Sequence, residues 1–552
     1  MREDQPIGKV SASEKYPTTV DEFCFWIQDE RLVRPFDIIK VNHYKNSVTY
    51  GVIEEITHIT DSPGHIGSYV SSDFGDVTSE PETLRLGLSF AKCRVLSNHP
   101  ASGNEAEQIY MPIRDGSSVY FADEEEIIES LGLKNIKNPI PAGFLETSNA
   151  SVPICFNRDF LIGPEGAHLN ISGISGLATK TSYVMFLLQA LQQKEKDIAF
   201  IVLNVKGTDL LRLDEENPKL REQQKSEYQK SQMACQPFEN VTCFYPYQKL
   251  AKCSYSNTYL SEQVLQFQHN RDRAFNYIYT YDEDRENLDL LFSNIDDPNQ
   301  TMESILNEIA ENPEFEGLTW ESFIDEIKEY TKKGHIKNKD ISIASWRKFS
   351  RLIRKSVKND IFQSNISAKE KRQKRLQQEI SNIKKGDLFV IDIAKLDEQL
   401  QCFVFGDIVK AVYDLKLGET EREEKEIPKR VVIFIDELNK YASSSAPKNS
   451  PILNSILEIA ERGRSMGIIL FSAEQFKSAI HDRAKGNCST HAYGRTNAIE
   501  ISKPDYRFIP KVFANMMTRL SKGELIIEHP IFRTLLKIKF PYPSYHQNQE
   551  EE

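Results

Sequence analysis

The feature that most constrains this chain is a glycine-rich turn that joins an apolar strand-like run to an apolar helix-like run. Residues 168–171 precede the turn, and residues 183–191 follow it. A continuous apolar run, residues 198–205, comes next, and such runs are typical of strands buried in a parallel sheet. Strand, loop, helix and strand in this order form a βαβ unit. The sequence therefore predicts an α/β fold with a mostly parallel sheet.

The turn is close to a phosphate-binding loop but has an unusual spacing. The usual pattern, G-x-x-x-x-G-K-[ST], places the lysine six positions after the first glycine. Counting from Gly173, that position is Thr179, and the lysine follows one residue later as Lys180. Thr179 also stands where a glycine is expected before the lysine. The loop either binds a nucleotide in a lengthened form, or it is a plain turn in which Thr179 caps the following helix.

If the loop binds a nucleotide, its residue types assign the contacts. Backbone N–H groups of a glycine-rich turn at a helix N-terminus bind phosphate oxygens. Lys180 would reach the β- and γ-phosphates, and Thr181 would ligate Mg²⁺, with Ser182 as the competing Mg²⁺ ligand. The predicted ligands are ATP and Mg²⁺. The predicted nucleotide-binding residues are Gly173, Ser175, Gly176, Ala178, Thr179, Lys180, Thr181 and Ser182.

A second nucleotide signal lies far downstream, where residues 431–435 form an apolar run that ends in Asp436 and Glu437. In ATPases with a phosphate-binding loop, one acid holds Mg²⁺ and another residue orients or deprotonates the attacking water. A buried strand holds such carboxylates at the edge of the sheet that faces the phosphates. An apolar strand followed by two acids is weak evidence for a nucleotide site by itself. Its combination with the glycine loop is specific for an ATPase site.

A third segment follows, in which a helix carrying Arg462 and Arg464 runs into an apolar strand that ends near Gln475. Together, these segments resemble the HerA family, the hexameric DNA translocases of the FtsK–HerA class. The resemblance covers roughly residues 140–545. Its motifs are Asp436-Glu437, Glu461-Arg462-Gly463-Arg464-Ser465-Met466-Gly467-Ile468, Glu474-Gln475, and Asn487-Cys488-Ser489-Thr490 with Arg495.

The resemblance implies roles for individual residues. Thr181 and Asp436 match the Mg²⁺ ligands, and Glu437 matches the catalytic glutamate. Gln475 matches the γ-phosphate sensor. The family's arginines correspond to Arg495, which would contact the nucleotide, and to Arg462 or Arg464, one of which would act on the neighbouring subunit. Two departures stand out: the loop spacing, and Glu474 where the family has threonine beside the sensor.

The resemblance also implies the architecture. It predicts a phosphate-loop core of the RecA-like type, an N-terminal small β-barrel and a helical insertion. Short alternating apolar runs separated by Gly, Asn and Ser support the barrel. The predicted domains are the barrel at 1–145, the core at 146–208 and 387–545, the helical insertion at 209–386, and a disordered tail at 546–552.

The resemblance further implies a homohexamer with DNA in a central channel, working with a separate effector such as a nuclease or a sirtuin-like NAD-consuming protein, in DNA processing or anti-phage defence. The alternative is a nucleotide-binding scaffold ring with weak turnover. A net charge of −12 argues against coating nucleic acid with the whole surface, but not against a narrow basic channel. Two basic segments, 346–355 and 369–385, are candidates to line it, unless each is simply a solvated helix face.

The remaining composition favours a cytoplasmic protein without a membrane segment. No run of about eighteen uncharged apolar residues occurs, and the N-terminus lacks the apolar core of a secretion signal. The eight cysteines form no C-x-x-C pair, which predicts reduced thiols and no cysteine-bound metal.

Overall fold

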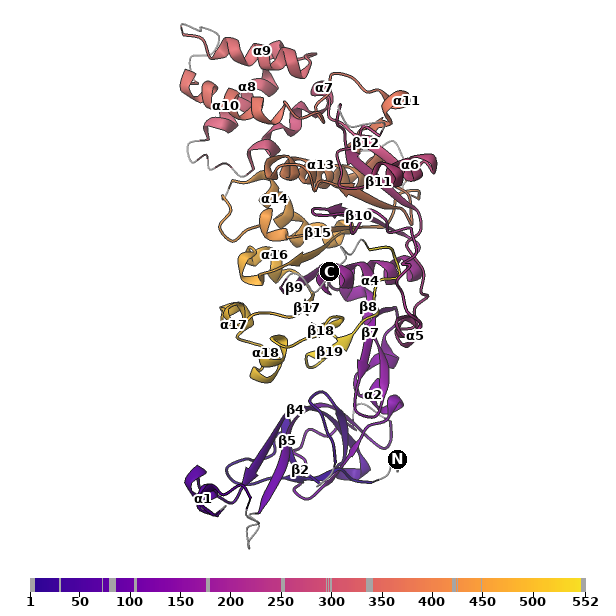
Figure 1. The fold of residues 1–552 in the computed structure, drawn as a ribbon, viewed down its shortest axis with the longest axis vertical. Helices are drawn as coiled ribbons and strands as arrows, with labels where there is room; N and C mark the ends of the chain where they lie inside the picture. The colour runs from indigo at the N-terminus through magenta and orange to yellow at the C-terminus, as the bar shows by residue number, and fades with distance from the viewer. Residues whose placement is uncertain are drawn as a thin grey trace.

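The computed structural model describes residues 5–28, 31–71, 73–78, 86–103, 107–174, 179–249, 254–293, 295, 297, 300–333, 341–418, 423, 425–447 and 449–547. The molecule is elongated, with a small barrel at one end, a large sheet in the middle and a group of helices at the other end (Figure 1). Within the described ranges, no helix combines the length and the apolar composition that crossing a membrane requires.

The N-terminal part is a closed antiparallel barrel, which confirms the predicted small β-barrel. Its spatial order is β1-β2-β5-β4-β3-β6. The barrel is joined to the rest of the molecule by apolar packing, since the rings of Phe36 and Phe513 lie 4.9 Å apart. The six strands are β1 (Gly8–Ser11), β2 (Glu22–Ile27), β3 (Ile38–Asn42), β4 (Val48–Thr60), β5 (Gly87–His99) and β6 (Ser118–Phe121).

A 13-stranded sheet forms the middle of the molecule and confirms the predicted α/β fold. Neighbouring strands are parallel from β13 to β17 and antiparallel from β17 to β8. The spatial order is β13 (Gln373–Lys374), β12 (Ala274–Tyr277), β11 (Val241–Pro246), β14 (Leu388–Asp392), β10 (Ile198–Asn204), β15 (Arg430–Asp436), β16 (Ile468–Glu474), β9 (Leu169–Ser172), β17 (Thr490–Tyr493), β18 (Glu524–Glu528), β19 (Leu536–Lys539), β7 (Pro139–Glu146) and β8 (Ser151–Asn157).

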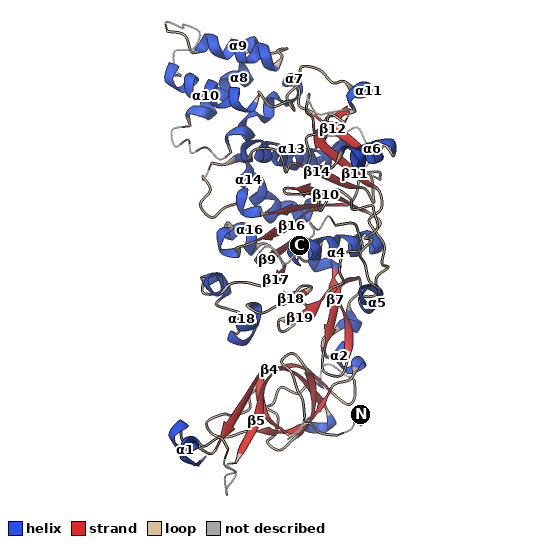
Figure 2. Ribbon diagram, in the orientation of Figure 1, coloured by secondary structure: helices blue, strands red, loops and turns tan. Residues whose placement is uncertain are grey.

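Helices cover both faces of the parallel part of the sheet (Figure 2). Successive residues of a strand point to opposite faces. Accordingly, Ile198, Phe200 and Val202 of β10 join the apolar core that contains α4 (Thr179–Lys194). Ala199, Ile201 and Leu203 join the core that contains α13 (Glu398–Leu417) and α14 (Pro451–Glu458). Burial on both faces explains why these strands are apolar throughout rather than alternating.

The remaining helices are short or lie outside the sheet layer. They are α1 (His65–Ser71), α2 (Glu124–Ser130), α3 (Arg158–Leu161), α5 (Glu222–Lys230), α6 (Glu262–Asn270), α7 (Tyr281–Asp284), α8 (Thr301–Glu311), α9 (Trp320–Tyr330), α10 (Ile343–Ser356), α11 (Ala368–Lys371), α12 (Leu376–Ser381), α15 (Arg464–Met466), α16 (Asp482–Gly486), α17 (Ala498–Ile501) and α18 (Lys511–Met517).

Residues 209–386, predicted as a helical insertion, are more than helical. They contain α5 to α12, and they also supply β11, β12 and β13, which extend the parallel sheet at one end. Helices α8, α9 and α10 lie beyond that end (Figure 1). At the C-terminus, the His546 N–H donates to the Glu215 carbonyl at 2.8 Å, so the beginning of the predicted tail is packed. Residues 548–552 lie outside the described ranges, and the domain boundaries stay predictions.

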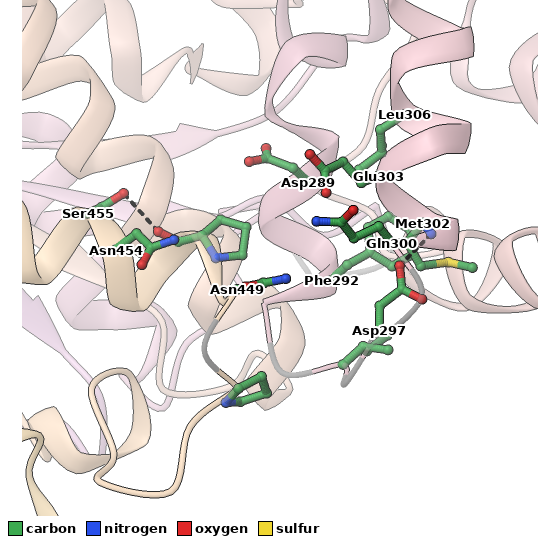
Figure 3. A pocket seen from close by; sticks show the side chains of 13 residues that line it. Asp289, Phe292, Asp297, Gln300, Met302, Glu303, Leu306, Asn449, Asn454 and Ser455 are labelled. Atoms are coloured by element: carbon green, nitrogen blue, oxygen red, sulfur yellow. Dashed lines mark hydrogen bonds between the residues drawn. The ribbon is translucent and has the colours of Figure 1, made fainter.

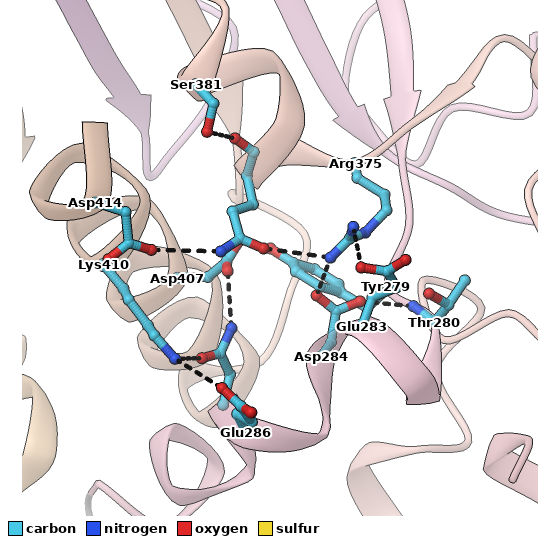
Figure 4. Close-up of polar contacts among 12 residues, drawn as sticks. Tyr279, Thr280, Glu283, Asp284, Glu286, Arg375, Ser381, Asp407, Lys410 and Asp414 are labelled. Carbon is cyan, nitrogen blue, oxygen red and sulfur yellow. Dashed lines mark hydrogen bonds and ion pairs between the residues drawn. The ribbon is translucent and has the colours of Figure 1, made fainter. Parts of the chain in front are cut away.

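A buried polar cluster joins the inserted segment to α13 (Figure 4). Asp407 of α13 accepts a hydrogen bond from the Asn287 amide at 3.0 Å, and Lys410 donates to the Asn287 oxygen at 2.8 Å. Beside them, Arg375 pairs with Asp284 at 3.1 Å. Burial, together with the nearby Asp284 carboxylate, raises the pKa of Asp407 from 3.8 to about 7.

This raised pKa predicts a pH-dependent stability. Between about pH 4 and 7 the folded chain holds a proton on Asp407 that the unfolded chain has lost, so stability falls as pH rises through that window. A shift of about three units corresponds to at most ~4 kcal/mol. Asp407→Asn, which stays neutral, is expected to lose less thermal stability than wild type between pH 5 and 8. The matched control is Asp325→Asn on the exposed side of α9. Equal pH dependence in Asp407→Asn and wild type would contradict the assignment.

Candidate nucleotide-binding site

The predicted site residues lie at the carboxyl edge of three adjacent strands. Strand β16 pairs with β9 on one side and with β15 on the other. The glycine loop, which follows β9, and the acids at the end of β15 are therefore one strand apart, about 10 Å across the sheet. The first turn of α4 spans this distance, because the Thr181 hydroxyl donates to Asp436 Oδ2 at 3.2 Å. The chain brings together two residues that are 255 positions apart.

The start of the glycine loop is held by backbone contacts on both sides. The Gly173 N–H donates to the Glu474 carbonyl at 3.1 Å, and the Ile174 N–H donates to the Arg495 carbonyl at 2.7 Å. A Cβ atom on Gly173 would lie 3.1 Å from the Gly494 Cα, so a side chain there would push the two segments apart. Three predicted binding residues, Ser175, Gly176 and Ala178, lie outside the described residues. Thr179 is the first residue of α4.

Lys180 is the most unusual residue of the site. Its side chain is 6% exposed, and its Nζ has no hydrogen-bond partner among the residues that the structure describes. Burial lowers the pKa of Lys180, and the nearby carboxylates, led by Asp436, act in the opposite direction. A buried ammonium group without a hydrogen bond is costly. An anion that enters the site would supply the missing acceptors.

The two acids at the end of β15 are in different environments. Asp436 is buried, and its Oδ2 faces both the Thr181 hydroxyl and the Lys206 ammonium, the latter at 3.1 Å. Glu437 has a left-handed backbone conformation (φ 61°), which is uncommon outside glycine and is often seen at functional sites. Partial burial raises the pKa of Glu437, but Lys440 at 2.6 Å and Lys206 at 3.6 Å outweigh it and hold the pKa below its ordinary value. Glu437 is therefore ionised at neutral pH.

Of the two candidate Mg²⁺ ligands on α4, only Thr181 contacts Asp436. The Ser182 hydroxyl instead accepts a long hydrogen bond, 3.5 Å, from the Gln547 amide near the C-terminus. The neighbouring Tyr545 is buried. Ser182 thus faces the C-terminal segment.

The remaining predicted site residues are the sensor glutamine and the three arginines, and within the described ranges none of them is seen in contact with the acids of β15. Gln475 follows β16 and is half-buried. Arg495 is exposed, and its Nε donates to the Thr518 carbonyl at 3.2 Å. Arg462 is 75% exposed and lies 3.7 Å from Glu458. Arg464 donates to the Glu165 carbonyl at 2.7 Å. The structure therefore does not bring Arg462 or Arg464 to the acids within one chain.

Two residues of the site were not identified from the sequence as functional. Lys206 follows β10, the strand next to β15, and the rule that parallel strands end at one edge of a sheet could have placed it beside Asp436. The second residue, Glu474, departs from the family motif beside the sensor, and the sequence assigns it no function. It is fully buried, burial raises its pKa to about 8, and neither carboxyl oxygen has a hydrogen-bond partner among the described residues.

A prominent cavity lies elsewhere. It has a volume of about 880 Å³ and lies between the segment around Asp289 and Glu303 and the segment around Asn449 and Asn454 (Figure 3). Neither the glycine loop nor the acids of β15 line it. Its acidic lining is unsuited to a triphosphate.

No protein family model matches this chain, and no curated protein matches it. Among solved structures, it is similar to the bacterial conjugative coupling protein TrwBdeltaN70, with 11% identity over 72% of this chain and 89% of that one (TM-score 0.43). It is also similar to VirB4 of Thermoanaerobacter pseudethanolicus, with 11% identity over 74% and 97% (TM-score 0.43). A third likeness is the genome packaging NTPase B204 from Sulfolobus turreted icosahedral virus 2, with 19% identity over 30% and 71% (TM-score 0.22). All three likenesses are distant.

Proposed function

We propose that this chain hydrolyses ATP with the help of Mg²⁺ and uses the hydrolysis to move DNA. The observation that carries the proposal is Lys180. This buried lysine has no hydrogen-bond acceptor among the described residues, and it lies at the N-terminus of a helix beside the two acids at the end of β15. A helix N-terminus with a lysine is suited to phosphate groups. The two acids supply what hydrolysis needs in addition: a ligand for a divalent cation and a base for water.

Each residue has a distinct task in this mechanism. Lys180 binds the β- and γ-phosphates and neutralises charge that develops on them. Thr181 and Asp436, whose oxygens already lie 3.2 Å apart, would hold Mg²⁺, because hard oxygen ligands suit this ion. Bound Mg²⁺ neutralises phosphate charge. Glu437, kept ionised by Lys440 and Lys206, orients the attacking water and accepts its proton.

The finer parts of the proposal rest on the resemblance to the HerA family. They comprise a homohexameric ring, DNA in its central channel, Gln475 as the γ-phosphate sensor and Arg495 as a nucleotide contact. Arg462 and Arg464 are exposed, which leaves them free to act on a neighbouring subunit. A separate effector, either a nuclease or a sirtuin-like NAD-consuming protein in DNA processing or anti-phage defence, completes the proposal.

A scaffold ring that binds nucleotide but turns it over slowly is the second candidate. The observation that favours it is the loop spacing, because Thr179 stands where a glycine usually precedes the lysine. In that case nucleotide would bind, and neither Glu437 nor DNA would affect its turnover.

Steady-state ATP hydrolysis with and without DNA separates the two candidates. A translocase is expected to hydrolyse ATP several-fold faster when duplex DNA is added, because movement along the substrate is coupled to the catalytic cycle. Heparin, a polyanion without base pairs, is the control. Slow turnover that neither duplex nor single-stranded DNA changes would support the scaffold.

A further inference from the structure

Helix α10 lies at the end of the molecule opposite the barrel and is strongly amphipathic, as predicted for residues 346–355 (Figure 1). One face carries Trp346, Phe349 and Ile353, which are buried in the core shared with α8 and α9. This face anchors the helix. The opposite face is left to solvent.

The exposed face is uniformly basic. Its cations follow one another at helical spacing, and they line a groove of about 400 Å³ together with Thr331 and Ser350. Among the described residues, neither an acidic nor an aromatic side chain lines this groove. We call this surface the α10 basic face. Its members are Arg347, Arg351, Arg354, Lys355 and Lys358.

These cations differ from those of the other basic segment, residues 369–385, because they have no acidic partner among the residues that the structure describes. In that other segment, Arg372 pairs with Asp272 at 2.7 Å, and Lys385 pairs with Asp197 at 2.7 Å. Across the described ranges, no member of the α10 basic face forms an ion pair; Arg347 donates only to the Thr331 carbonyl. In a chain of net charge −12, a face whose cations form no ion pair among the described residues is a local exception. Arg354 and Lys358 also line a neighbouring groove that contains Glu321, Asp325 and Asp360.

The helix dipole explains only part of this pattern. Cations in the last turn of a helix are stabilised by the dipole, which accounts for Arg354 and Lys355. Arg347 lies in the first half of α10, where the dipole does not favour a positive charge. An anionic ligand would account for all the cations of the α10 basic face, including Arg347.

We infer that the α10 basic face binds the phosphate backbone of double-stranded nucleic acid. From Arg347 to Lys355 the row spans about 12 Å at ~1.5 Å per residue, with Lys358 just beyond the helix end, and this equals the axial length of about three to four base pairs at ~3.4 Å each. Single-strand sites use aromatic side chains as stacking platforms, and protein interfaces use buried aromatic or apolar anchors. The groove has neither, so a duplex fits it better than a single strand or an acidic protein.

The inference takes from the proposed function only that the substrate is DNA. The face is separate from the glycine loop and the acids, and it binds without nucleotide. Duplex binding without ATP and ATP hydrolysis without DNA therefore test the two proposals separately.

The test is the affinity of the full chain for a duplex of about 20 base pairs, measured by fluorescence anisotropy without nucleotide over a range of salt concentrations. The triple variant Arg351→Ala, Arg354→Ala, Lys358→Ala is expected to bind at least ~10-fold more weakly at low salt. The slope of log K against log salt is expected to be shallower by about 2 to 3, because each phosphate contact contributes about 0.9. A single strand of equal length is expected to bind more weakly than the duplex.

Two matched variants complete the design. Lys328→Ala, Lys332→Ala removes one cation of neighbouring α9 and one just after it, which already pair with Asp325 and Glu329, and is expected to keep wild-type affinity. Arg351→Lys, Arg354→Lys keeps the charge and is expected to retain binding even if the alanine variant fails to fold. The inference would be overturned if the alanine variant kept the wild-type affinity and salt slope, or if the Lys328→Ala, Lys332→Ala control lost as much affinity. It would also be overturned if the alanine variant bound the duplex normally but lost self-association.

Discussion

Lys180→Ala is expected to abolish ATP hydrolysis, with a loss of roughly 100-fold or more, and to weaken ATP binding. Removing one group that stabilises charge in the transition state typically costs about 10² to 10³ in rate. Lys180 has no hydrogen-bond acceptor among the described residues, so its structural contribution in the free protein is small. The measurements are steady-state hydrolysis and nucleotide titration of the purified variant.

The control for this variant lies on the same helix. Lys194→Ala removes a lysine from the last turn of α4, about 20 Å away at 1.5 Å per residue, and is expected to keep full hydrolysis. Because Lys180 is buried and forms no hydrogen bond with the described part of the chain, Lys180→Ala is also expected to unfold at a temperature no lower than wild type in the absence of nucleotide. Full hydrolysis in Lys180→Ala would mean that the phosphates bind elsewhere.

Glu437→Gln is expected to lower hydrolysis by a factor of roughly 10² to 10⁴, the usual contribution of a general base, while ATP binding is retained. The amide cannot accept a proton from water, but it keeps the shape of the side chain. The contrast with Lys180→Ala is diagnostic, because Lys180→Ala is expected to lose affinity for ATP, whereas Glu437→Gln is expected to lose only turnover. Single-turnover hydrolysis and equilibrium ATP binding measure the two quantities.

The matched change, Glu458→Gln, removes a carboxylate at the end of α14 whose nearest cation is Arg462 at 3.7 Å. It is expected to leave hydrolysis by the isolated subunit unchanged. Equal turnover by wild type and Glu437→Gln would remove Glu437 from the mechanism and favour the scaffold.

Strands and helices with strong local patterns were predictable from sequence. The apolar runs that became β10, β14, β15 and β16 are buried on both faces, so no polar alternation obscured them. Strands β11, β12 and β13 were missed, because they are short and lie between charged helices in a segment of helical character. Their strand conformation depends on tertiary pairing. Strand β11 pairs with β14, more than a hundred positions away, β12 pairs with β11, and β13 pairs with β12.

In the candidate site, too, some features were predictable from the sequence and others were not. The sequence by itself determined the order of the glycine loop, the acidic strand and the basic helix, since each depends on residues close together in the chain. Only the tertiary structure decided that Thr181 and not Ser182 contacts Asp436, and that Lys206 joins the acids. It also decided that the cations of α10 form no ion pair within the described ranges, unlike Arg372 and Lys385. Such pairings join residues up to hundreds of positions apart, and local spacing carries no information about them.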